Sequence, residues 1–221
     1  NKQITVSGDK SLSIRWALLA SQATGKSKAY NLLMSQDVIA TLNALKKLGI
    51  KINFKKKYCE ILGNGINGFK YKKNLTIDAK NSGTLGRLIL GLLIKSPQKI
   101  KLIGDKSLSR RDFSRVTKPL QKFGAQFFYE NKNKLPLSII GSKLPKGINY
   151  IETKGSAQCK STVMLAALNA NSETSIKAEK SRDHSELLFK YLKIPIKIKK
   201  TKKYDFINIQ KPKKIKSFDY K

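Results

Sequence analysis

The pattern of apolar and polar positions repeats three times along the chain. In each repeat, a polar turn leads into a segment that is apolar on nearly every side, which is typical of a helix buried all round. These segments cover 11–23, 82–94 and 156–170, and successive ones begin about 72 residues apart. We therefore predict three central helices in three copies of one structural unit.

Each predicted central helix is followed by the same further elements. A short β-like run comes first, at 29–33, 100–103 and 174–178, and a second, amphipathic helix follows it. The apolar positions of the second helices lie near a 3.6-residue period: Val38, Leu42, Leu45 and Leu48, then Phe113, Val116, Leu120 and Phe123, then Leu187, Leu188, Tyr191 and Leu192. Each second helix should therefore bury one face, and the alternating run after it predicts a strand.

The ends of the second helices also match. Gly49 and Gly124 stand where a left-handed C-cap is expected, and Lys193 takes this place in the third repeat. Pro119 should kink the second helix of the second repeat. Three such units predict an α/β fold in which the central helices are buried together, the sheets lie outside, and the helix N-termini converge.

Composition is that of a globular protein. With 221 residues and 40% hydrophobic content, the chain is long enough to bury a core. No stretch approaches the ~18 apolar residues of a membrane helix, and no signal-peptide pattern opens the chain, so we expect a cytoplasmic protein. Because the chain begins at Asn1 and no turn or cap signal closes 217–221, we expect a fragment.

The formal net charge of +32 is only weak evidence about function. Such a charge is typical of a nucleic-acid-binding protein, but the lysines are scattered through every segment and are not gathered with aromatic residues. Arginine, by contrast, is used sparingly, and its planar fork suits phosphate and carboxylate groups. The six arginines are therefore candidate ligand contacts: Arg15, Arg87, Arg110, Arg111, Arg115 and Arg182.

Cysteine and histidine point to no metal or disulfide chemistry. Cys59 and Cys159 lie far apart without a CxxC motif, so we expect two small buried side chains. His184 is the only histidine in the sequence, which excludes a metal site built from several histidines, and we expect a structural role for that residue.

The start of the first central helix carries the first candidate site. Lys10, Ser11 and Arg15 would stand beside free backbone N–H groups and the positive end of the helix dipole. This combination suits a phosphate or a carboxylate. Taken alone, the segment could equally be a serine N-cap with solvent-facing cations.

The starts of the second and third central helices carry similar candidate sites. Gly83 would let a ligand approach the backbone, and Arg87 lies one turn inside the same helix. A loop then presents two adjacent arginines, of which one can point inward. The third start offers small residues and one amide, Gln158, while Arg182 stands beside the next helix start.

Five motifs together resemble those of the EPSP synthase (3-phosphoshikimate 1-carboxyvinyltransferase) family, in the same order and over nearly the whole chain. They are Lys10-Ser11-x-Ser13-x-Arg15, Asn81-x-Gly83-Thr84-x-x-Arg87, Gly104-Asp105 through Arg111, Ser156-Ala157-Gln158, and Arg182-Asp183-His184-x-Glu186.

The resemblance implies one lobe of an inside-out α/β protein of two lobes, each built from three βαβαββ-type units. It also implies a transferase that moves the enolpyruvyl group of phosphoenolpyruvate to the 5-hydroxyl of shikimate 3-phosphate, through a tetrahedral intermediate, with release of phosphate. No metal or organic cofactor is implied, and the complete protein is expected to be a monomer with these two small-molecule substrates.

The resemblance further assigns substrate contacts. The phosphoenolpyruvate set is Lys10, Gly83, Arg111 and Gln158. The shikimate 3-phosphate set is Lys10, Ser11, Arg15, Ser156, Ala157, Gln158 and Arg182. Arg87 matches a motif position and is given only a supporting role.

The family's acidic proton-transfer residues belong to its other lobe, so no catalytic residue is expected in this chain, and the chain alone should be inactive. We expect a three-repeat lobe at 10–210. Residues 1–9 and 211–221 would be strands crossing toward the second lobe, poorly ordered without it.

Two other readings of the sequence compete with this one. UDP-N-acetylglucosamine carboxyvinyltransferases share the lobe architecture, but they carry Lys-Asn after the first strand and a reactive loop cysteine. Here Ser11 follows Lys10, and no cysteine lies between Gly104 and Phe113. The other reading, a basic nucleic-acid-binding module, would require selective binding beyond the retention that positive charge alone produces.

Overall fold

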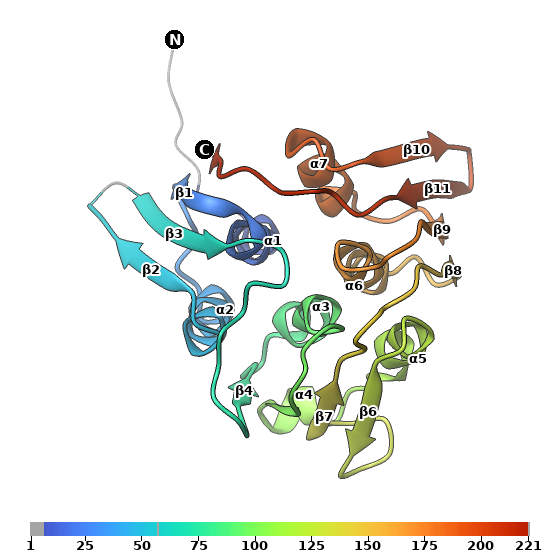
Figure 1. Cartoon of the computed structure of the whole chain (residues 1–221), viewed down its shortest axis with the longest axis horizontal. Helices are drawn as coiled ribbons and strands as arrows, with labels where there is room; N and C mark the ends of the chain where they lie inside the picture. Colours follow the sequence, from blue (N-terminus) through green and yellow to red (C-terminus); the bar gives the residue numbers. More distant parts are fainter. Residues whose placement is uncertain (1–6, 57, 221) are drawn as a thin grey trace.

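The computed structural model describes residues 7–56 and 58–220, and over these residues the chain forms three α/β units (Figure 1). The first unit contains α1 (Lys10–Gln22), β1 (Thr24–Tyr30), α2 (Gln36–Lys47), β2 (Lys51–Phe54) and β3 (Tyr58–Asn64). The second contains β4 (Thr76–Asp78), α3 (Gly83–Leu92), β5 (Ile100–Ile103), α4 (Lys106–Ser109), α5 (Ser114–Lys122), β6 (Gln126–Tyr129) and β7 (Leu137–Ile140). The third contains β8 (Asn149–Glu152), α6 (Ala157–Ala167), β9 (Thr174–Glu179), α7 (His184–Tyr191), β10 (Ile196–Lys200) and β11 (Tyr204–Ile209).

Each unit builds one four-stranded sheet with the same order of strands. In the second sheet β4 runs parallel to β5, and β7 and β6 then add antiparallel. The third sheet repeats this arrangement with β8, β9, β11 and β10. The first sheet takes its parallel edge strand from the other end of the chain, because β12 (Asp219–Tyr220) pairs with β1 in the place that β4 and β8 hold.

The predicted central helices α1, α3 and α6 lie together in the middle of the molecule, and the three sheets surround them (Figure 1). Their residues are buried on almost every side. Two of these helices approach closely at Gly91 of α3, where a Cβ atom would lie 2.3 Å from the carbonyl oxygen of Thr162 in α6. The absence of a side chain at Gly91 therefore lets the two helices pack backbone to backbone.

The helix starts are capped in two ways. Ser82 and Ser156 are the N-caps of α3 and α6, as a serine at these places predicts. In α1 the cap is Asp9, whose carboxylate accepts a hydrogen bond of 2.7 Å from the backbone N–H of Leu12. Ser11 therefore lies inside the first turn, and its hydroxyl is available to another partner.

The C-cap prediction is confirmed in all three units. Gly49 and Gly124 have φ angles of +83° and +102°, and Lys193 adopts the same left-handed region with φ +53°. Both cysteines are buried, as expected.

Two predictions about local structure are wrong. The first strand begins at Thr24 and not at 29, because its inward positions are the small residues Ser27 and Ala29, which give a weak hydrophobic signal. In α7, Leu187 and Tyr191 are 55% and 54% exposed. This eight-residue helix buries Leu188, as predicted, and Phe189, which was not predicted.

The end of the described chain also differs from the expected division into 10–210 and 211–221. Ile215 is buried, and its carbonyl oxygen accepts a hydrogen bond of 2.8 Å from Thr24 N–H. Phe218 packs edge-on against Trp16 at 6.5 Å between ring centroids. The lobe therefore continues through β12 because these apolar side chains cover the start of the first unit. Residues 1–6 of the expected N-terminal strand lie outside the described residues.

Within the described part of the chain, no helix is long and apolar enough to cross a membrane.

Candidate active site

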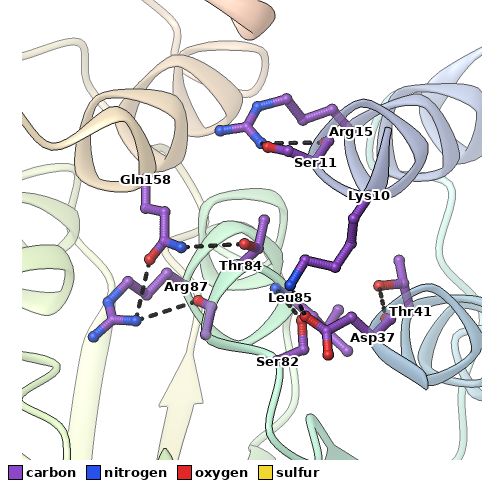
Figure 2. Close-up of polar contacts among 11 residues, drawn as sticks. Lys10, Ser11, Arg15, Asp37, Thr41, Ser82, Thr84, Leu85, Arg87 and Gln158 are labelled. Carbon is purple, nitrogen blue, oxygen red and sulfur yellow. Dashed lines mark hydrogen bonds and ion pairs between the residues drawn. The ribbon is translucent and has the colours of Figure 1, made fainter. Parts of the chain in front are cut away.

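Helix starts from all three units are connected by side-chain hydrogen bonds. Arg15 of α1 bonds to residues of α6 and α7, and Arg87 of α3 bonds to Gln158 of α6. Figure 2 shows Lys10, Ser11 and Arg15 on one side of this region, with Arg87 and Gln158 on the other. The predicted convergence of the helix N-termini is thus present in the structure.

Arg15 is buried and bonded through all three guanidinium nitrogens. Its Nε donates to Ser185 Oγ at 3.0 Å, and its Nη2 donates to Ser161 Oγ at 3.0 Å. Its Nη1 donates to the carbonyl oxygen of Ser11 at 3.2 Å and to the Ser11 hydroxyl. Neutral oxygen atoms therefore fix the orientation of this cation, and within residues 7–56 and 58–220 no carboxylate forms an ion pair with it.

The surroundings of Arg15 lower its pKa. Burial lowers the pKa of Arg15 to about 10, and the positive charge of Arg182 adds to this lowering. Glu186 and Asp9 act in the opposite direction. Even so, Arg15 carries its positive charge at neutral pH.

A second cationic group surrounds Gly83. A Cβ atom at this position would lie 2.9 Å from Nη1 of Arg87 and 3.1 Å from Nη1 of Arg111. Two guanidinium groups thus meet above a residue without a side chain. Among the described residues, no carboxylate forms an ion pair with either of them.

Arg87 is held in this position by uncharged groups. Its Nη1 donates to Gln158 Oε1 at 3.2 Å, and its Nη2 donates to the carbonyl oxygen of Asp112 at 3.3 Å. Its guanidinium carbon lies 5.0 Å from the centre of the Phe113 ring. Burial lowers the pKa of Arg87, and the charges of Arg111 and Arg115 contribute to the same shift. An anion placed here would relieve this repulsion.

The amide of Gln158 is oriented from both ends. Its oxygen accepts from Arg87, and its Nε2 donates to Thr84 Oγ1 at 3.1 Å (Figure 2). The predicted ligand contact at Gln158 is therefore also the bridge between α3 and α6.

Lys10 reaches the site from the surface. Its side chain is 52% exposed, and its Nζ lies 3.1 Å from Asp37 Oδ2 (Figure 2). An exposed pair of this kind stabilises little, so Lys10 can exchange this partner for a ligand.

Ser156 and Ala157 form the start of α6, and Glu152 anchors it. The backbone N–H of Ser156 donates to Glu152 Oε2 at 2.8 Å, while Glu152 Oε1 pairs with Arg115 at 2.7 Å. Arg115 therefore supports the loop before α6. Arg182 is exposed beside the start of α7, close enough for its charge to influence Arg15.

Several residues of this site have no counterpart among the predicted contacts. They are Asp37, Thr84, Ser161 and Ser185. Ser185 is 170 positions from Arg15, and a serine inside a helix carries no local signal of such a contact. Thr84 could have been predicted as a residue of this site, because it belongs to the sequence motif that contains Gly83.

The fold and the site together define an α/β lobe in which a buried arginine and an arginine pair lie at neighbouring helix starts, an arrangement that suits anions. The family model for EPSP synthase (3-phosphoshikimate 1-carboxyvinyltransferase) matches residues 1–220. The chain belongs to this family.

Relatives and solved structures agree with the family match. The chain is 39% identical over 189 residues to the 3-phosphoshikimate 1-carboxyvinyltransferase of Leuconostoc mesenteroides subsp. mesenteroides, covering 85% of this chain and 43% of that protein. It is 42% identical over 201 residues to that of Ruthia magnifica subsp. Calyptogena magnifica, covering 90% and 46%. The structure of EPSP synthase from Acinetobacter baumannii superimposes with a TM-score of 0.89 at 33% identity, covering 99% of this chain and 48% of that one. The chain thus spans about half the length of these proteins.

Proposed function

We propose that this chain is one lobe of a transferase that moves the enolpyruvyl group of phosphoenolpyruvate to the 5-hydroxyl of shikimate 3-phosphate. The products are 5-enolpyruvylshikimate 3-phosphate and inorganic phosphate. The observation that carries the proposal is the presence of two separate cationic groups at neighbouring helix starts, one around Arg15 and one around Gly83. The reaction has two anionic substrates, so each group has one to bind.

Arg15 is assigned to the phosphate of shikimate 3-phosphate. Its guanidinium already has a fixed orientation, and charged hydrogen bonds to a phosphate are roughly twice as strong as neutral ones. The remaining contacts of this substrate are proposed to come from Lys10, Ser11, Ser156, Ala157, Gln158 and Arg182.

Arg111, Gly83, Gln158 and Lys10 are assigned to phosphoenolpyruvate. The bare backbone at Gly83 allows the ligand to come close, and Arg111 with Arg87 supplies positive charge beside it. Cations fixed beside the phosphate stabilise the negative charge that develops on it as it leaves. Arg87 acts by keeping Gln158 and this charge in place.

The proton-transfer groups are proposed to lie in the other half of the enzyme, so the isolated chain should bind its substrates weakly and should not turn them over. The complete protein is proposed to be a cytoplasmic monomer without a specific nucleic-acid partner. Selective nucleic-acid binding that survives Arg15→Ala and Arg182→Ala would contradict the last point.

A chimera tests the proposal. The 221-residue chain replaces the matching half of the Leuconostoc mesenteroides relative, and phosphate release is measured with both substrates. We expect turnover by the chimera and none by the isolated chain. A folded chimera that binds neither substrate would refute the proposal, and full turnover by the isolated chain would refute its division between two halves.

A further inference from the structure

A buried ion pair lies directly behind the Arg15 site. Lys160 Nζ is 2.5 Å from Glu186 Oε1, and the two side chains are 0% and 3% exposed. Among the described residues, no hydrogen bond reaches Lys160 Nζ or either carboxylate oxygen of Glu186. In the part of the chain that the structure describes, each group therefore has only the other at ion-pair distance.

A gain in folding stability alone does not explain why this ion pair is present in the interior. Removing two charges from water costs as much as their attraction returns, so buried pairs are often no more stabilising than apolar side chains of similar volume. What the pair does fix is geometry, because separating the two groups would leave a lone charge in the interior. It therefore holds the first turn of α7 (His184–Tyr191) against α6 (Ala157–Ala167).

The residues next to the pair are the two serines that bind Arg15. Ser161 follows Lys160 on α6, and Ser185 precedes Glu186 on α7. Both hydroxyls accept from the Arg15 guanidinium at 3.0 Å, and Ser185 Oγ donates to Ser161 Oγ at 2.7 Å. A shift of α7 relative to α6 would separate these two hydroxyls and release the arginine.

We propose that Lys160 and Glu186 are positioning residues for shikimate 3-phosphate: their ion pair aligns α6 with α7 so that Ser161 and Ser185 orient Arg15. The identity of the ligand rests on the proposed function, whereas the effect on Arg15 does not. Glu186 also supplies negative charge near Arg15, which opposes the loss of its proton.

The test replaces both charges at once. Lys160→Met with Glu186→Leu keeps the interior filled and leaves no lone charge, so the variant should remain folded. The matched control is Lys101→Met with Glu130→Leu, which removes an exposed ion pair on the second sheet. Two quantities are measured on the 221-residue chain: calorimetric affinity for shikimate 3-phosphate, and the exchange rate of the Arg15 Nε–H proton by NMR.

We expect the Lys160/Glu186 variant to bind shikimate 3-phosphate about tenfold more weakly, which corresponds to one hydrogen bond to a charged group. The Arg15 Nε–H proton should exchange at least ~10 times faster, since its bond to Ser185 is no longer held. The control should change neither quantity. An unchanged exchange rate would overturn the proposal, whatever the affinity.

The two proposals fail in different ways. If the parent chain does not bind shikimate 3-phosphate but the variant still accelerates Arg15 exchange, the ligand assignment is wrong and the positioning role stands. If this double variant does not fold, Lys160→Met with Glu186→Gln replaces it, because glutamine keeps the shape of the glutamate side chain and no lone charge remains. Unchanged Arg15 exchange in that variant would then refute the positioning role.

Discussion

Arg15 and the Arg87–Arg111 pair are both cationic, and neutral acceptors hold both Arg15 and Arg87, but the two sites differ in exposure and in the spacing of their charges. Arg15 is buried, and two serine hydroxyls from other helices fix its guanidinium. Arg87 and Arg111 approach each other above Gly83, and Arg111 is exposed. The first site is complete before a ligand arrives, whereas the second contains a repulsion that an anion would relieve.

The difference suggests an order of events. A preorganised site loses little entropy on binding, so shikimate 3-phosphate should bind first and more tightly to this lobe. On the proposed function, we expect phosphoenolpyruvate to bind second, at Arg87 and Arg111, and to depend more strongly on the other half of the enzyme.

The largest expected effect comes from removing the preorganised cation. Arg15→Ala should weaken shikimate 3-phosphate binding to the chain by about 30- to 100-fold, from the loss of charged hydrogen bonds worth about 2–3 kcal/mol. Calorimetry measures this, with Arg110→Ala as a control because Arg110 is exposed outside the site. A loss smaller than about threefold would mean that Arg15 is not the phosphate contact.

The next effect concerns Arg87 and Arg111, which approach each other above Gly83. Gly83→Ala would place a Cβ atom within 3.1 Å of both guanidinium groups, which must move apart. In the chimera, KM for phosphoenolpyruvate should rise about tenfold while KM for shikimate 3-phosphate changes little, because the added methyl group fills the space through which this ligand would approach the backbone, a crowding that costs roughly 1–2 kcal/mol. Equal effects on both substrates would show that the two sites are not separate.

A smaller effect should follow from loosening the Gln158 amide. Thr84→Val removes the acceptor of its Nε2–H, so the amide can rotate away from Arg87. KM for phosphoenolpyruvate should rise about three- to fivefold, as expected for the loss of one neutral hydrogen bond. Thr41→Val on α2, whose hydroxyl bonds only to its own helix, is the control. If KM is unchanged, Gln158 is oriented by Arg87 alone.

The smallest effect near neutral pH is the pH dependence of the Arg15 charge. Because burial lowers the pKa of Arg15 to about 10, the guanidinium is charged below that pH and loses its proton above it. The NMR shift of its Cζ atom should titrate near pH 10. Affinity for shikimate 3-phosphate should fall over the same range. The absence of any titration of Arg15 below pH 12 would contradict the burial argument.

Features that depend on local sequence patterns could be predicted from the sequence. Gly49, Gly124 and Lys193 mark equivalent helix ends because each must adopt a left-handed backbone, and pairs such as Gly83 and Arg87 share a helical face by spacing alone. The contacts of Ser161 and Ser185 with Arg15 could not be predicted, since they depend on how three helices pack. The position of β12 also depends on a partner strand almost 200 residues away.

The most direct test of the central claim is an NMR titration of the 221-residue chain with each substrate separately. We predict that shikimate 3-phosphate binds more tightly than phosphoenolpyruvate and shifts the signals of Ser11, Ser161 and Ser185, together with the Arg15 side chain. Tighter binding of phosphoenolpyruvate, or binding of shikimate 3-phosphate that leaves the Arg15 signals unchanged, would contradict the account.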